Sequence, residues 1–140
     1  MANNLLHEDD TRDAIAGAVR GAIHNGSSTG VSMSFFTQAE GTQTGTGFAS
    51  IDMGATPFAA VNTTNHTFKY TGTATGTNSG AARTFASFAI YDRITPTANK
   101  VIKGSVGNAT GTFDVEITGG PVFADGEKVQ LTAFTYTASV

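Results

Sequence analysis

Val31-Ser32-Met33-Ser34-Phe35 marks the point where the sequence changes from a helical pattern to a strand pattern. Apolar and polar side chains alternate here, which is typical of a β-strand that buries one face. Comparable runs follow towards the C-terminus: Phe48–Met53, Thr67–Thr71, Phe85–Tyr91, Val101–Val106, Phe113–Ile117 and Lys128–Thr137. Turn-forming residues separate them at short intervals, so the sequence predicts a mainly β, antiparallel domain of the sandwich or jelly-roll type.

Two of these runs depart from simple alternation. Phe85–Tyr91 is apolar on both faces, which predicts a strand that is central or has its outer face covered by another chain. In Lys128–Thr137 the apolar residues change face after Ala133, which predicts a bulge or an interface at that point. The stretches 41–47 and 71–77 alternate Thr and Gly, and they are compatible with edge strands or with loops.

The residues before the first strand predict a short helix. Residues 9–11 offer side-chain oxygens for an N-cap, and Asn25-Gly26 supplies a stop. The apolar stripe of this helix comprises Ile15, Ala18, Val19, Ala22 and Ile23. Two internal glycines weaken the helix, so it should form only when it docks, either on its own domain or on a neighbouring subunit. We therefore divide the chain into a helix and arm over residues 1–30 and a β-sandwich domain over residues 31–140.

Composition narrows the classes of partner. The 140 residues carry a net charge of −3 and no cysteine, which argues against disulfides, thiolate zinc sites and cysteine nucleophiles. Basic residues are scattered singly, so we expect no nucleic-acid partner. No apolar run approaches the roughly 20 residues that span a bilayer, and the first residues lack the pattern of a signal peptide. We expect no membrane association and assembly in a reducing cytoplasm.

Residues that could carry chemistry do not form a recognisable motif. His7, His24 and His66 are far apart and lack metal-ligand spacing, so we interpret them as surface or turn histidines. Asp114 and Glu116 share a strand face and could imitate a catalytic pair, but the solvated face of a half-buried strand explains them as well. We therefore predict no catalytic residue, no cofactor and no metal, and a protein that is not an enzyme.

Short motifs in the second half of the chain occur in an order that resembles a known group of proteins. They are Thr56-Pro57-Phe58, Gly72-Thr-Ala-Thr-Gly76, Ala86-Ser-Phe-Ala-Ile-Tyr-Asp92, Lys103-Gly-Ser-Val-Gly107, Phe113-Asp-Val-Glu-Ile117 and Asp125-Gly-Glu-Lys-Val-Gln-Leu131. The chain from Gly72 to Thr137 resembles small virion proteins of tailed bacteriophages, in which a helix precedes Gly/Thr-rich strands. Arg93–Asn99 is longer than the corresponding pattern of that group, so contacts made by this loop are not carried over.

This resemblance implies a component of the virion, assembled in the host cytoplasm, and first of all a head decoration (cement) protein. Such a protein binds the major capsid protein and itself, commonly as a trimer, and bridges neighbouring capsomers. The group has no enzymatic residues. The low charge and the surplus of aromatic residues agree with surfaces that contact other subunits. We assign these contacts to Ile15, Val19, Phe85, Tyr91, Phe134 and Tyr136.

Two alternatives remain open from the sequence. The first is a neck, tail or receptor-binding module of the virion that contacts glycans, for which Tyr91 and Tyr136 are the stacking candidates. The second is a glycan hydrolase, which would need a pair of carboxylates converging in a cleft, and Asp114 and Glu116 are the candidates for that pair.

Overall fold

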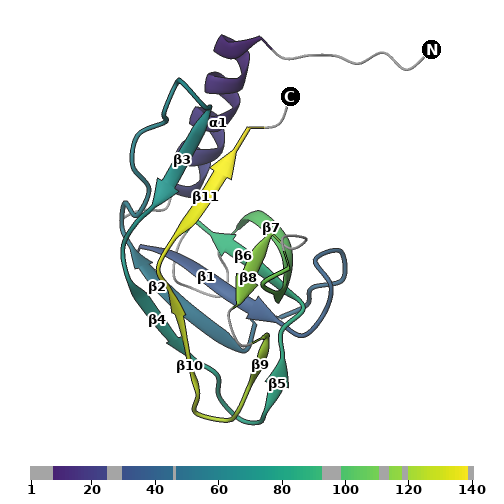
Figure 1. Ribbon diagram of the computed structural model, residues 1–140. Helices are drawn as coiled ribbons and strands as arrows, with labels where there is room; N and C mark the ends of the chain where they lie inside the picture. Colours follow the sequence, from purple (N-terminus) through teal and green to yellow (C-terminus); the bar gives the residue numbers. More distant parts are fainter. Residues whose placement is uncertain are drawn as a thin grey trace, which may run out of the picture.

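The computed structural model describes residues 8–24, 30–45, 47–92, 99–110, 114–117 and 120–138. The chain is mainly β, with one N-terminal helix and antiparallel sheets, as the sequence predicts. Figure 1 shows the elements α1 (Asp9–His24), β1 (Val31–Phe36), β2 (Ala49–Gly54), β3 (Thr67–Tyr70), β4 (Ala74–Thr77), β5 (Arg83–Thr84), β6 (Ser87–Tyr91), β7 (Lys100–Asn108), β8 (Val115–Ile117), β9 (Val122–Phe123), β10 (Lys128–Leu131) and β11 (Phe134–Thr137).

The largest sheet has five strands in the order β2-β1-β6-β7-β8. Its pairs are antiparallel except for β7 and β8, which run parallel. Every side chain of β1 and β6 is buried, because these strands lie inside the sheet and both of their faces are covered. The two-faced apolar run Phe85–Tyr91 therefore contributes a central strand, and Ala89 and Tyr91 on its second face form a small buried cluster with Phe36 of β1.

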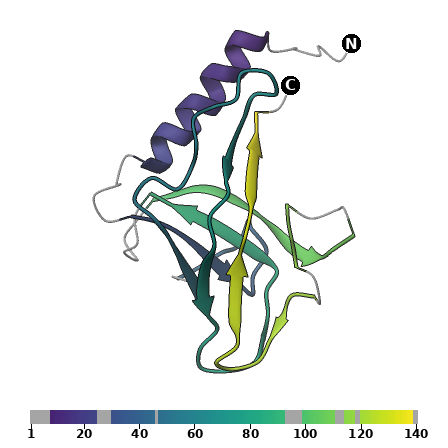
Figure 2. The same cartoon turned by 60° about the vertical axis from the view of Figure 1, so that its left-hand side comes forward.

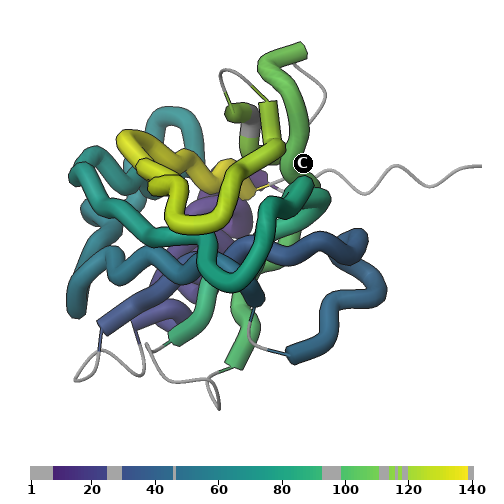
Figure 3. Tube along the Cα trace, turned by 90° about the horizontal axis from the view of Figure 1, so that it is seen from below, coloured from purple at the N-terminus to yellow at the C-terminus, as the bar shows by residue number. Residues whose placement is uncertain are grey.

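Three two-stranded ribbons, β4–β10, β3–β11 and β5–β9, complete the described structure. The β4–β10 ribbon turns Gly76, Val129 and Leu131 inward, and these residues are buried against the sheet. Gly76 lies on the backbone of β2, so close that a Cβ atom there would be 2.5 Å from the Ser50 carbonyl oxygen. The strand segments surround the centre of the molecule, with α1 behind them in the view from below (Figure 3).

The run Lys128–Thr137 forms two strands and not one strand with a bulge. β10 pairs with β4, whereas β11 pairs with β3, and the exposed residues Thr132 and Ala133 connect them. The change of apolar face arises because the chain leaves one ribbon and joins another, and each ribbon turns its own apolar side chains to the core. Of the two Thr/Gly stretches, 71–77 contributes β4, while the described residues of 41–47 form turns and bends.

Helix α1 docks on its own domain. Ala16 and Ile23 are fully buried and belong to the same core cluster as the strands. Ala18 and Ala22 are exposed, so the predicted apolar stripe is wrong at these positions. The helix contacts β3 and β7 (Figure 2), and the face that it turns to the core carries Ala16 and Ile23. The stop predicted at Asn25-Gly26 lies outside the described residues.

Polar contacts fasten both halves of α1 to the segment between β2 and β3. The Arg20 guanidinium donates to the carbonyl oxygens of Phe58 (2.9 Å) and Ala59 (2.7 Å). His66 Nδ1 lies 2.8 Å from Asp13 Oδ1, and its Nε2 lies 3.3 Å from an oxygen of Asp9. Isolated helices of this length are marginal in water, so these contacts and the buried face together hold α1 in place.

His66 differs from the surface or turn histidine that the sequence suggested. It lies in a turn, but only 4% of the residue is exposed. Its backbone φ is +55°, the left-handed region, and no other described non-glycine residue has a positive φ. Its carbonyl accepts a hydrogen bond from the Ala138 amide (3.1 Å), so the residue joins the turn, the helix and the end of β11. His24 is half-buried, and His7 lies outside the described residues.

Candidate functional site

The residues assigned to subunit contacts from the sequence mostly lie in the chain's own core. Phe85, Tyr91 and Phe134 are 1%, 5% and 9% exposed, so the chain itself buries these three side chains. Phe85 packs between the rings of Phe35 and Phe123, with ring centroids 5.5 Å and 5.4 Å away. These aromatic residues are the main filling of the space between the sheet and the ribbons, which explains why they are abundant.

The other three assigned residues are half-buried. Ile15 and Val19 pack against the core from α1. Tyr136 stacks on Phe68 with ring centroids 4.9 Å apart. Tyr91 is buried, so the two tyrosines that the sequence suggested for glycan stacking do not form an exposed pair. In the part of the chain that the structure describes, Val122 is the one large apolar residue that is exposed, at 64%.

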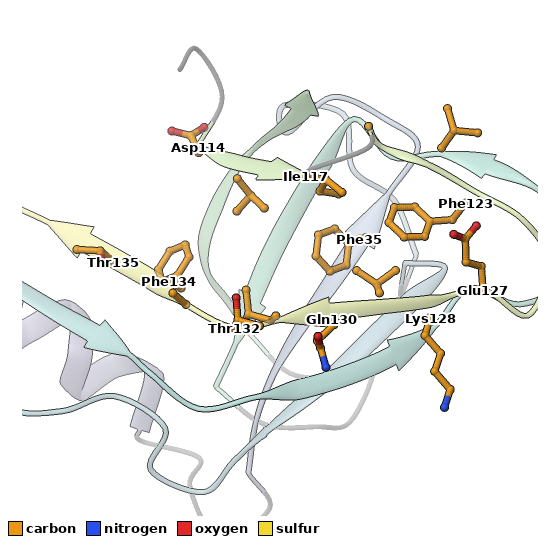
Figure 4. Close-up of a pocket in the computed structure, with 16 residues that line it drawn as sticks. Phe35, Asp114, Ile117, Phe123, Glu127, Lys128, Gln130, Thr132, Phe134 and Thr135 are labelled. Atoms are coloured by element: carbon orange, nitrogen blue, oxygen red, sulfur yellow. The ribbon is translucent and has the colours of Figure 1, made fainter. Parts of the chain in front are cut away.

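Val122 is one of the residues that line a groove between β8 and β10, shown in Figure 4. The groove has a volume of about 720 Å³. Its apolar lining comes from β1 and from the consecutive strands β8 to β11, and it includes Phe35, Val115, Ile117, Val122, Leu131 and Phe134.

The strands on either side of the groove have free edges. Among the described residues, β8 pairs only with β7, and β10 pairs only with β4. The second edge of each strand is therefore not paired with any other described strand, although the Ile117 carbonyl oxygen of β8 accepts a hydrogen bond from the Gly120 amide at 3.0 Å. Such edges are templates for pairing with another chain.

A buried asparagine fixes the end of the groove where β9 turns into β10. Asn78 is fully buried, and its side-chain NH₂ donates to the carbonyl oxygens of Ala81 (2.8 Å), Phe123 (3.1 Å) and Ala124 (2.8 Å). Its backbone amide donates to the Glu127 carbonyl oxygen at 2.9 Å. The Asn78 side chain thereby holds the ends of β5, β9 and β10 together. The sequence did not reveal this role, because an asparagine in a Gly/Ser-rich stretch is typical of a turn.

Carboxylates stand at the two ends of the groove, Asp114 near Phe134 and Glu127 near Phe123 (Figure 4). Glu127 Oε2 accepts a hydrogen bond from the Ala124 amide at 2.7 Å. Lys128 and Gln130 project away from the aromatic residues of the groove (Figure 4). The carboxylates of Asp114 and Glu127 are therefore the charged groups at its two ends.

Asp114 is held by β7. Its Oδ2 accepts hydrogen bonds from the backbone amide and the hydroxyl of Ser105, both at 2.7 Å. These bonds keep the pKa of Asp114 below its usual value and favour the charged form. The side chain of Glu116 lies outside the described residues, so the structure does not bring the two predicted acids together.

Comparisons with protein-family models, with curated proteins and with solved structures find no significant match to this chain. Within the described ranges, no helix is long and apolar enough to cross a membrane, and His, Asp and Glu side chains form no group suited to a metal ion.

Replacing Asp114 with asparagine should destabilise the protein in a pH-dependent manner. The folded-state pKa of Asp114 is lowered, so its contribution is present above the unfolded value of about 3.9 and is lost as the pH falls through the folded value. Because the carboxylate is exposed and screened, we expect a loss of less than about 1 kcal/mol at pH 7. The loss should shrink as the pH falls below the unfolded pKa of Asp114.

Urea denaturation of both proteins between pH 2 and 7 measures this difference. In a Ser105→Ala background the effect of Asp114→Asn should be smaller, since one of the two hydrogen bonds is already absent. A difference that stays constant over the whole pH range would contradict the assignment.

Proposed function

We propose that this chain is a non-enzymatic structural protein of a tailed-bacteriophage virion, and specifically a head decoration (cement) protein. In this proposal it assembles as a trimer, binds the major capsid protein and bridges neighbouring capsomers. Its strands and ribbons would then form a domain of the sandwich or jelly-roll type. The motif order between Thr56 and Leu131 supports the class of protein.

The single observation that carries the proposal is the groove between β8 and β10. A solitary domain usually blunts its strand edges with charge or closes them by pairing. Here two edge strands, β8 and β10, line one groove, and exposed Val122 lines it as well. A site of this kind suits a protein that works by binding another chain.

The groove also replaces the aromatic contact residues that the sequence suggested. Standard interfaces bury about 1,600 Å² in total, so one groove supplies only part of a stable contact. A trimer repeats the groove three times, and this multiplicity raises the strength of binding to a symmetric capsid. In this proposal, binding to the capsid depends on three copies of one small groove and not on a single large apolar surface.

Binding to phage heads tests the proposal. Purified heads of the phage that encodes this chain, stripped of it, should co-sediment with the recombinant protein in a saturable manner. Val122→Asp should weaken this binding at least about tenfold, because it places a charge on the exposed apolar rim. Ala60→Asp makes the same kind of change at an exposed position outside the groove, and it should bind like the parent.

Light scattering and electron microscopy of the labelled particles complete the test. A strictly monomeric protein that leaves the heads unlabelled would contradict the decoration role. Label confined to necks or tails would instead favour the alternative position on the virion.

A further inference from the structure

We infer that the groove accepts an extended segment of another protein, with apolar residues at alternate positions and a basic residue near each end. The segment would lie between β8 and β10 as an added strand. The strand edges favour an extended backbone, the lining of the groove favours apolar side chains at alternate positions, and the ends of the groove favour basic residues.

The edge of a strand determines the backbone conformation of the segment that pairs with it. An unpaired strand edge offers alternating donors and acceptors, and only an extended chain presents the matching groups. β10 runs for four residues, Lys128–Leu131, with β4 on one side and the groove on the other. A helix in the same place would satisfy none of the edge groups, so the edge selects an extended segment.

The lining of the groove determines which side chains the segment carries. Successive side chains of a strand point to opposite faces, so only every second residue of the segment can face the floor. These inward residues meet Val115, Ile117, Leu131 and Phe134, all of which line the groove. Apolar side chains at alternate positions therefore fit, and the residues between them face solvent.

The two ends of the groove determine the charge of the segment. Asp114 and Glu127 stand at opposite ends of the groove, and both are exposed (Figure 4). The Ser105 hydrogen bonds favour the ionised form of Asp114. Lys or Arg near each end of the segment would pair with these carboxylates, whereas acidic residues there would be repelled.

The inference rests on the proposed function only in assigning the segment to a capsid protein. The strand-acceptor property belongs to the groove itself and can be measured with a synthetic peptide. Peptide binding without head binding would overturn the proposed function alone, and head binding without peptide binding would overturn this inference alone.

The probe is the fluorescent peptide acetyl-Lys-Val-Thr-Val-Thr-Val-Lys-amide, titrated with the full chain at low ionic strength. We expect saturable binding, with changes in the backbone amide resonances of Val129–Leu131. The double variant Asp114→Asn/Glu127→Gln should weaken binding about tenfold, as loss of two exposed ion pairs implies. Both substitutions keep a side-chain oxygen as a hydrogen-bond acceptor, and Asp10→Asn on α1 is the matched control.

Two peptide variants test the basic ends and the extended, apolar centre of the segment separately. Glutamate in place of both lysines should weaken binding by a similar factor or more, and added salt should narrow the difference. Proline in place of the central valine should abolish binding, because it removes a backbone donor and an inward side chain. Equal binding of the acidic peptide, resonance changes away from β10, or no saturable binding would each overturn the inference. A dimer of this chain that Val122→Asp dissociates would also overturn it, since a second copy would then occupy the groove.

Discussion

Asn78→Asp is expected to lower the free energy of unfolding by about 3 kcal/mol or more, the largest loss among the single substitutions proposed for this protein. Aspartate has the same shape as asparagine, so the change is chemical and not steric. The Asn78 NH₂ group donates to three carbonyl oxygens in a fully buried site. Aspartate would place an acceptor, charged or protonated, against these oxygens and leave at least two of them without their donor.

Urea denaturation followed by circular dichroism measures the loss. Asn62→Asp is the matched control, since Asn62 is exposed and uses its Oδ1 only as an acceptor from the Thr64 amide. That variant should lie within about 0.5 kcal/mol of the parent. A loss below about 1 kcal/mol for Asn78→Asp would mean that the three contacts do not organise the β5, β9 and β10 ends.

Gly76→Ala should cost about 3 kcal/mol, although alanine is the smallest possible addition. A Cβ atom at this position would lie 2.5 Å from the Ser50 carbonyl oxygen and 3.0 Å from a carbon of Ile51. The first obstacle is backbone in β2, which cannot rotate away as a side chain can. The β4–β10 ribbon would have to lift from the sheet, and the groove would lose the position of its β10 edge.

Gly21→Ala is the opposite case and serves as the control. Gly21 lies in α1 with open space around its Cβ position, so alanine should stabilise the protein by about 1 kcal/mol. Thermal unfolding of the two variants beside the parent should show shifts of opposite sign. A neutral Gly76→Ala would show that β4 and β2 can separate without loss of the core.

A variant that keeps its fold but displaces β10 would also link stability to binding. If Gly76→Ala remains folded, we expect it to bind the basic-ended peptide more weakly than the parent does. The peptide depends on the spacing between β8 and β10, which the contact of Gly76 with β2 helps to set.

The helix and most of the longer strands follow from the sequence, because the direction of successive side chains is a local property; the two-residue strands β5 and β9 were not predicted. Alternation over Val31–Phe35 predicts β1, and the buried Ala49, Ile51 and Met53 confirm the face predicted for β2. The predicted helix extends from Asp9 to His24. In each case the evidence lies within a few neighbouring residues.

What the tertiary structure decided is which strand pairs with which, and which apolar residues remain at the surface. Nothing local in Lys128–Thr137 reveals that its halves join different ribbons, and nothing local in Phe85 or Phe134 reveals that the chain's own ribbons bury them. The groove follows in the same way, since Phe35 and Leu131 meet there only after folding. Side-chain periodicity is set by the chain's own covalent geometry, whereas pairing and burial depend on residues brought together over long sequence distances.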